Sequence, residues 1–141
     1  MKLEQQHRET LSVLGYLYLR MGELDRAGRV FAALLAVGKD AEAGEDVPLW
    51  AKALTRLAHS SLAVVELERG NSRATLEHLH QAMDGQVLSS RHAALHLLRA
   101  RALWRQGRED EARLAVETFV RLSGGLADNV VPQAYMSMEK K

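Results

Sequence analysis

The sequence contains no cysteine and only two prolines among its 141 residues. Without cysteine the chain forms no disulfides and offers no thiolate ligands to a metal, which fits a reducing compartment. The scarcity of proline, together with abundant Ala, Leu, Arg and Glu, favours helix along nearly the whole chain. We therefore predict an all-α protein in the cytoplasm.

The chain also lacks a strong net charge and a long apolar run. Its 19 Lys and Arg residues face 18 Asp and Glu residues, for a net charge of +1, so no overall field favours nucleic acid or an anionic membrane. The N-terminal stretch MKLEQQHRETLSVLGYL has acidic residues and no unbroken apolar segment. We predict neither a secretory signal nor insertion into a membrane.

The clearest positive pattern is a helical hairpin between Gly15 and Val37. Apolar residues recur at steps of three and four on both sides of Gly22, and a glycine at that point ends the first helix because it adopts a positive φ without steric cost. The offsets match those of the tetratricopeptide repeat, a helix-turn-helix unit of about 34 residues. The matching residues are Gly15, Tyr18, Gly22, Ala27 and Phe31.

Two later glycines predict two further hairpins. Gly70 and Gly107 follow Gly22 at intervals of 48 and 37 residues, which equal the repeat period plus insertions of about 14 and 3 residues. The predicted fold is three tetratricopeptide-like hairpins stacked in a right-handed superhelix over 1–125, with 126–141 as a C-terminal capping helix or a flexible tail. Gly38 is expected to end the second helix, and 39–47 to form a loop. The predicted helices cover 4–21, 23–37, 48–69, 72–85, 91–106 and 109–122.

Six histidines raise the question of a metal site. His92 and His96 share a helix face, but neither a third ligand nor an HExxH arrangement accompanies them. His59 and His96 occupy the repeat position that usually holds tryptophan, which favours packing. No nucleophile elbow, phosphate loop or paired-carboxylate site is present either. We predict no metal, no cofactor and no catalytic residue, and hence a protein that is not an enzyme.

The first helix of each hairpin lines the concave face of a tetratricopeptide array. Large apolar side chains at those positions predict a groove for an apolar or amphipathic helical peptide. A register slipped by one residue would instead place the same side chains in the core. Tyr16, Leu67 and Trp104 are expected to be the principal contacts. The predicted protein-binding residues are Tyr16, Leu19, Arg20, Val64, Leu67, Leu97, Arg101 and Trp104.

Several segments of the first and third hairpins carry a family resemblance: Gly15-Tyr16-Leu17, Leu19, Gly22, Arg26-Ala27, Ala33-Leu34-Leu35, Arg101-Ala102, Gly107 and Glu111-Ala112-Arg113. Over about residues 10–123 the chain resembles the tetratricopeptide export-apparatus chaperones of bacterial type III secretion, the YscY or SctY type. The resemblance implies a cytoplasmic, non-catalytic chaperone that binds a small secreted partner of the YscX type and engages the inner-membrane export gate.

Two alternatives stay open at this point. A needle-subunit or translocator chaperone of the same secretion system is close to the first interpretation, whereas a general repeat scaffold would bridge two folded proteins. An unfilled apolar groove also favours self-association of the free protein.

Overall fold

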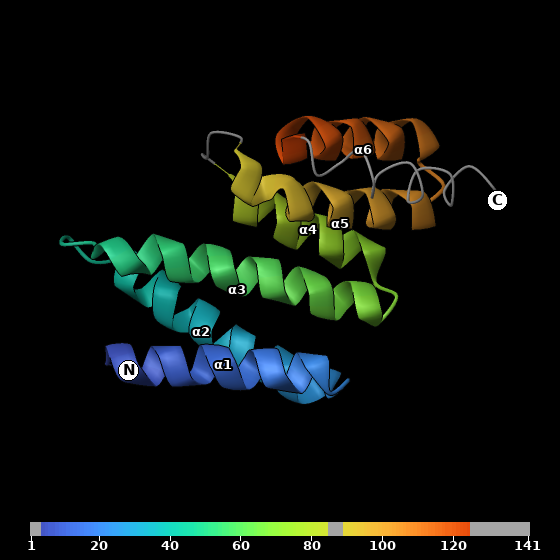
Figure 1. Ribbon diagram of the computed structural model, residues 1–141. Coiled ribbons are helices and arrows are strands. Elements are labelled where there is room, and N and C mark those ends of the chain that lie inside the picture. Colours follow the sequence, from blue (N-terminus) through green and yellow to red (C-terminus); the bar gives the residue numbers. More distant parts are fainter. Residues whose placement is uncertain (1–3, 85–88, 125–141) are drawn as a thin grey trace. The chain divides into compact units, whose positions relative to one another are not determined.

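The computed structural model describes residues 4–84 and 89–124 (Figure 1). These residues form helices and turns without any strand, which confirms the all-α prediction. The predicted segment 126–141 and the predicted helix end at Gly85 lie outside the described residues. The helices are α1 Gln5–Arg20, α2 Leu24–Glu42, α3 Leu49–Glu68, α4 Ser72–Met83, the 3₁₀ turn η1 Ser90–His92, α5 Ala93–Arg105 and α6 Glu109–Ser123.

Contacts between the helices divide the chain into two units, Met1–Ala82 and Met83–Lys141. In the first unit α2 packs against both α1 and α3, and in the second unit α5 packs against α6 and η1. Each unit therefore has packing of its own. A single continuous stack of three hairpins stays a prediction.

The three hairpin turns have one common geometry. Gly22, Gly70 and Gly107 have φ values of 78°, 83° and 76°, in the left-handed region that glycine adopts without a steric penalty. The residue after each glycine donates its N–H to the carbonyl five residues earlier, over 2.8, 2.8 and 3.0 Å. This is the Schellman pattern that satisfies the last carbonyls of a helix. The predicted helix ends at these glycines are confirmed.

Helix α2 is longer than predicted. It runs to Glu42 and passes through Gly38, which is buried inside the helix instead of ending it. A Cβ on Gly38 would lie 2.5 Å from Thr55 Oγ1 and 3.2 Å from the Thr55 backbone nitrogen. Glycine at this position lets α3 approach α2 closely. The predicted loop over 39–47 is therefore wrong for residues 39–42, and the connection to α3 is shorter.

The core of the first unit lies mainly between α2 and α3. Ala27 and Leu34 of α2 are completely buried, as are Ala58 and Val65 of α3. Apolar side chains of α1, such as Leu11 and Tyr18, are packed against this cluster. The core residues are Ala27, Phe31, Leu34, Val37, Leu54, Ala58, Leu62 and Val65.

The second unit uses small residues where its helices meet. Ala100 and Ala102 of α5 and Ala112 of α6 are completely buried. Ala112 follows the turn glycine Gly107 at the same offset as Ala27 follows Gly22, and both alanines are fully buried. The first and third hairpins therefore agree in the turn geometry and in this small packing residue.

Candidate protein-binding groove

An open groove of about 740 Å³ lies between α1 and α3 in the first unit. We call it the α1–α3 groove. Both helices are the first helix of a hairpin, and the groove is formed by their N-terminal halves. Its lining residues are Gln5, Arg8, Glu9, Ser12 and Val13 from α1, and Leu49, Trp50, Ala53, Leu54 and Leu57 from α3.

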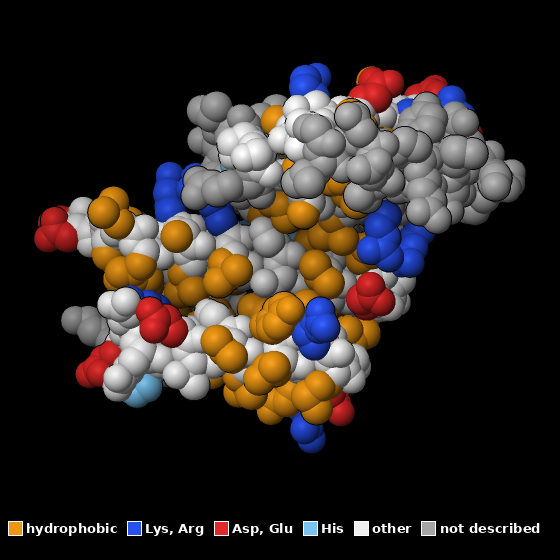
Figure 2. Space-filling view, viewed as in Figure 1, with side chains coloured by type: hydrophobic (Ala, Val, Ile, Leu, Met, Phe, Trp, Pro, Cys, Tyr) orange, Lys and Arg blue, Asp and Glu red, His pale blue; other side chains and the backbone are white. Residues whose placement is uncertain are grey.

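Large apolar side chains in this groove are exposed to solvent. Val13 is 58% exposed, Leu57 is 45% exposed and Leu49 is 98% exposed. Figure 2 shows hydrophobic side chains gathered over α1 and α3 on the face in view. An apolar patch with polar residues at its edge is typical of a site that binds another protein.

One wall of the groove is held by a cation–π contact between the two helices. The guanidinium carbon of Arg8 lies 3.7 Å from the centre of the Trp50 ring. Such a contact is worth about 0.5–1 kcal/mol at an exposed site. Gln5 donates a hydrogen bond over 3.0 Å to the carboxylate of Glu9, which lies one turn later in α1. The polar side chains at the edge of the groove therefore interact with neighbours, while its apolar floor stays open.

Three of the predicted binding residues in the first unit do not line the α1–α3 groove, although each lies on a helix face that continues toward it. Tyr16 is 54% exposed and follows Val13 by about one helical turn, so both are on one side of α1. Val64 is half-buried and follows Leu57 by two turns on α3. Arg20 is exposed at the end of α1, with its guanidinium carbon 5.9 Å from the centre of the Tyr16 ring.

Two predicted binding residues belong to the packed interior. Leu67 is 0% exposed, and Leu19 is partly buried against the core of the first unit. The prediction that Leu67 is a principal contact in an open groove is wrong. Val64 and Leu67 are three residues apart and so lie near the same side of α3, yet only Val64 keeps part of its surface exposed. For this side chain the alternative interpretation as a core residue is correct.

The remaining predicted residues lie in the second unit. Leu97, Arg101 and Trp104 follow one another at steps of one turn along α5, so they share one side of that helix. Arg101 is exposed, while Leu97 and Trp104 are half-buried. The structure brings these three together on α5. The α1–α3 groove is formed entirely by the first unit.

None of the residues that line the groove was among the predicted ones. Val13, Leu49, Trp50, Ala53 and Leu57 all lie closer to the helix N-termini than the predicted contacts. Continuing the predicted faces from Tyr16 and Val64 toward the start of each helix would have found Val13 and Leu57, because side chains one or two turns apart share a face.

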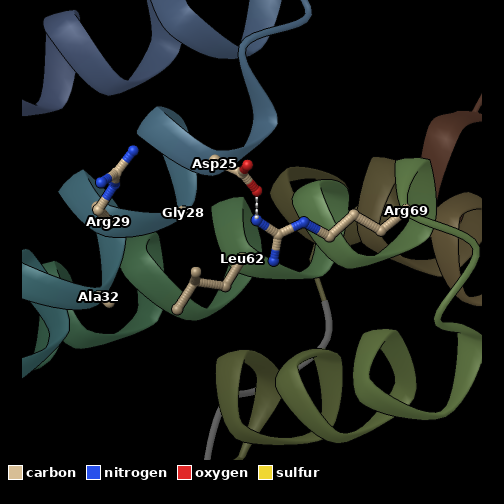
Figure 3. A pocket seen from close by; sticks show the side chains of 6 residues that line it. All are labelled: Asp25, Gly28, Arg29, Ala32, Leu62 and Arg69. Carbon is tan, nitrogen blue, oxygen red and sulfur yellow. Dashed lines mark hydrogen bonds and ion pairs between the residues drawn. The ribbon is translucent and has the colours of Figure 1, made fainter.

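A second hollow, of about 520 Å³, lies between α2 and α3 (Figure 3). It exists because Gly28 and Ala32 have little or no side chain on this side of α2. Arg69 donates a hydrogen bond to Asp25 over 2.6 Å at its edge, where the Asp25 side chain is 86% exposed and that of Arg69 is 37% exposed. Exposed ion pairs contribute at most about 1 kcal/mol. The hollow is therefore a minor feature beside the α1–α3 groove.

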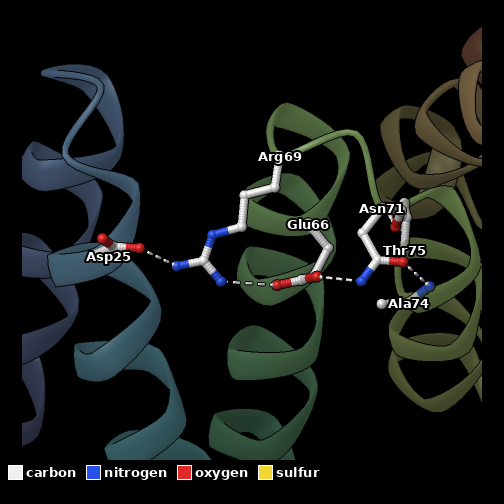
Figure 4. A network of polar contacts seen from close by, with 6 residues as sticks. All are labelled: Asp25, Glu66, Arg69, Asn71, Ala74 and Thr75. Carbon is white, nitrogen blue, oxygen red and sulfur yellow. Dashed lines mark hydrogen bonds and ion pairs between the residues drawn. The ribbon is translucent and has the colours of Figure 1, made fainter.

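The same arginine belongs to a polar network that links three helices (Figure 4). Arg69 also donates to Glu66 over 3.1 Å, and the other carboxylate oxygen of Glu66 accepts a hydrogen bond from Asn71 over 2.9 Å. Asn71 in turn accepts one from the backbone N–H of Ala74 over 3.3 Å. Asn71 thus caps α4, and the network fixes the turn between α3 and α4.

Among the described residues, no three His, Asp or Glu side chains gather in an arrangement suited to a metal ion. None of the helices in this part of the chain combines the length and the apolar character needed to cross a membrane. Comparison of the sequence and structure with protein-family models, with curated proteins and with solved structures finds no match.

Proposed function

We propose that this chain is a non-catalytic chaperone of bacterial type III secretion, of the YscY or SctY type. It holds a small secreted partner, YscX-like, in the α1–α3 groove and delivers it to the inner-membrane export gate from the cytoplasm. The observation that carries the proposal is the groove itself, with its exposed Val13, Leu49 and Leu57. The family resemblance supplies the kind of partner.

The shape and chemistry of the groove suit an amphipathic helix. Its floor is apolar and its edge carries Arg8, Gln5 and Glu9. A helix with apolar residues at steps of three and four would cover the floor and leave its polar side in water. Complete burial of a valine or leucine side chain contributes about 1.5–3 kcal/mol. Covering these exposed side chains would therefore contribute to association.

The fold that goes with this function is a right-handed superhelix of three tetratricopeptide-like hairpins. Support comes from the three equivalent glycine turns and from Ala27 and Ala112, which are buried at equivalent positions. In such an array the first helices line a concave surface. Leu97, Arg101 and Trp104 on α5 would then extend the binding surface beyond the first unit.

Two exposed leucines make a matched test. Leu57 lines the groove and is 45% exposed, whereas Leu114 on α6 is 61% exposed and does not line it. Both Leu57→Glu and Leu114→Glu should fold, because neither side chain is buried. Leu57→Glu should weaken partner binding by roughly 30-fold or more, the size of a hot-spot loss of about 2 kcal/mol.

The binding assay is co-purification from the native bacterium, followed by titration of the identified partner. The parent and Leu114→Glu should bring down one small secreted protein, and Leu57→Glu should lose it. Equal retention of the partner by both variants would refute the groove as its binding site. Recovery of several unrelated folded proteins would favour the general scaffold, and recovery of a needle subunit or a translocator would favour the other class of secretion chaperone.

A further inference from the structure

Two histidine rings meet head to head between α3 and α4. The Nδ1 atoms of His59 and His78 lie 3.0 Å apart, and their ring centres are 5.3 Å apart with an angle of 40° between the planes. His59 is only 6% exposed. A hydrogen bond between two Nδ1 atoms requires one ring to donate an N–H and the other to accept with a lone pair. At least one of the two imidazoles must therefore be neutral.

The surroundings of His59 disfavour a positive charge. Burial lowers the pKa of His59 below its ordinary value of 6.5, and the nearby His78 and Lys39 lower this pKa further. Glu42 of α2 acts in the opposite direction, but its carboxylate already accepts a hydrogen bond from Thr55 over 3.0 Å. The neutral form of His59 is the favoured one at pH 7.

His78 is in a similar position. Burial is again the main cause that lowers its pKa below 6.5, with a smaller contribution in the same direction from Lys39. Glu66 of α3 and Glu77 of α4 raise this pKa. Glu66, however, is already paired with Arg69 and Asn71. Both rings of the pair are therefore predominantly neutral at pH 7.

We propose that the His59–His78 pair is a pH-sensitive latch, which holds α4 on α3 at neutral pH and releases it in acid. One proton on the pair leaves a donor on one Nδ1 and a lone pair on the other, so the hydrogen bond survives. A second proton places N–H groups on both facing atoms and two like charges 3.0 Å apart. The bond is then lost and the rings repel.

The latch lies at the end of the first unit. Its boundary falls at Ala82, in the last turn of α4. The start of α4 is held separately by the Asn71 cap and the polar network. Loss of the histidine contact would thus weaken the attachment of the remainder of α4, which is also held by the buried Leu79 and Ala82 and from which the chain continues into the second unit. This device is independent of the partner that the α1–α3 groove binds.

The direction of the pH dependence follows from proton linkage. Because both pKa values are lowered in the folded state, the folded chain binds fewer protons than the opened chain. The latch is complete above pH 6.5, the ordinary histidine value, and weakens as the pH falls below it. Each pKa unit of lowering corresponds to about a tenfold change in the opening equilibrium.

Amide hydrogen exchange on the full chain tests the latch. Exchange is measured at pH 7.5 and pH 5 and corrected for the intrinsic pH dependence of amide exchange. The amides of α4 should lose more protection at pH 5 than those of α2. His78→Gln should reduce this acid-dependent loss. His80→Gln, which alters an exposed ring in a hollow lined also by His59 and His78, should leave the acid-dependent loss as in the parent.

The proposal would be overturned if the amides of α4 and α2 lost protection equally at pH 5. It would also be overturned if the His78→Gln variant showed the same acid-dependent loss of protection in α4 as the parent. A second measurement on the unmodified chain covers the case in which His78→Gln fails to fold. The imidazole ¹⁵N shifts of His59 and His78 should titrate below pH 6.5 in two coupled steps. Independent titration of either ring at or above pH 6.5 would equally refute the latch.

Discussion

Gly15 of α1 lies directly against the ring of Phe31 in α2. A Cβ on Gly15 would be 2.7 Å from Phe31 Cζ and 2.9 Å from Cε2, and both residues are buried. The glycine therefore sets how closely α1 and α2 approach. These are two of the residues whose spacing predicts a tetratricopeptide-like hairpin, and the contact gives a physical reason for that spacing.

Gly15→Ala should destabilise the protein. Removing a glycine from a helix interior gains about 0.5–1 kcal/mol, but overpacking a full core costs about 1–3 kcal/mol. The free energy of unfolding from urea melts should therefore fall. In a double-mutant cycle Phe31→Leu should recover part of the loss, because it removes the ring that the new methyl group meets. A stabilised Gly15→Ala, or strictly additive effects, would contradict the contact.

Gly38→Ala and Gly44→Ala form a matched pair of glycine substitutions. A Cβ on Gly38 would meet Thr55, including its backbone nitrogen at 3.2 Å, whereas the nearest atom to a Cβ on Gly44 is at 3.8 Å. Gly38→Ala should lower the free energy of unfolding by about 1–3 kcal/mol. Gly44→Ala should change it by less than about 0.5 kcal/mol. Denaturant melts that show two neutral variants would argue against the close approach of α2 and α3.

Replacing His96 with leucine should stabilise the protein. It is 8% exposed, and its Nδ1 and Nε2 atoms are buried without a hydrogen-bond partner. Leaving buried polar groups unsatisfied costs about 1–3 kcal/mol. His96→Leu should raise the free energy of unfolding at pH 7 by up to that amount. His7→Leu, at an exposed position of α1, serves as the control and should have little effect.

The same substitution has a pH signature. Burial, with Arg99, His92 and Arg121 nearby, lowers the pKa of His96 below 6.5. The unfolded chain therefore takes up a proton at His96 more readily than the folded chain, and stability decreases as the pH falls below 6.5. His96→Leu should make the decrease shallower. Parallel stability curves for parent and variant between pH 7 and pH 5 would show that the ring titrates normally.

Leu67 and Tyr16 should differ sharply when each is changed to glutamate. Leu67 is 0% exposed and Tyr16 is 54% exposed. A carboxylate forced into the site of Leu67 loses the packing of a buried leucine, worth about 2–5 kcal/mol, and its own hydration as well. Leu67→Glu should therefore melt far below the parent, and Tyr16→Glu close to it. Similar melting temperatures of the two variants would show that Leu67 is not a core residue and would support it as a binding residue.

The helices and their turns were accessible from the sequence because they depend on local rules. Apolar spacing marks the helices, and Gly22, Gly70 and Gly107 mark their ends. The prediction that Gly38 ends a helix was wrong because glycine does not occur only at helix ends. It also permits another element to come close, and at this position the other element is Thr55 of α3. Only the tertiary contact distinguishes a helix end from a close approach.

Only part of the candidate binding site could be predicted from the sequence, because burial also depends on tertiary contacts. Periodicity indicates which side chains share a helix face, so Tyr16 and Val64 lie in line with groove residues. It does not say which residues of such a face are covered by the rest of the protein, and Leu67, on the same side of α3 as Val64, is buried. The pairing of His59 with His78 depends on how two helices cross. No spacing rule predicts which of the six histidines meet.

Trp50 gives the protein an internal optical probe. Its indole forms part of the groove wall and lies under the Arg8 guanidinium at 3.7 Å. The chain has two tryptophans, and the other, Trp104, belongs to α5. In a Trp104→Phe chain the emission therefore comes from the groove wall alone. A helix that displaces water or moves the guanidinium would change that emission, so occupancy can be followed in solution without an attached dye.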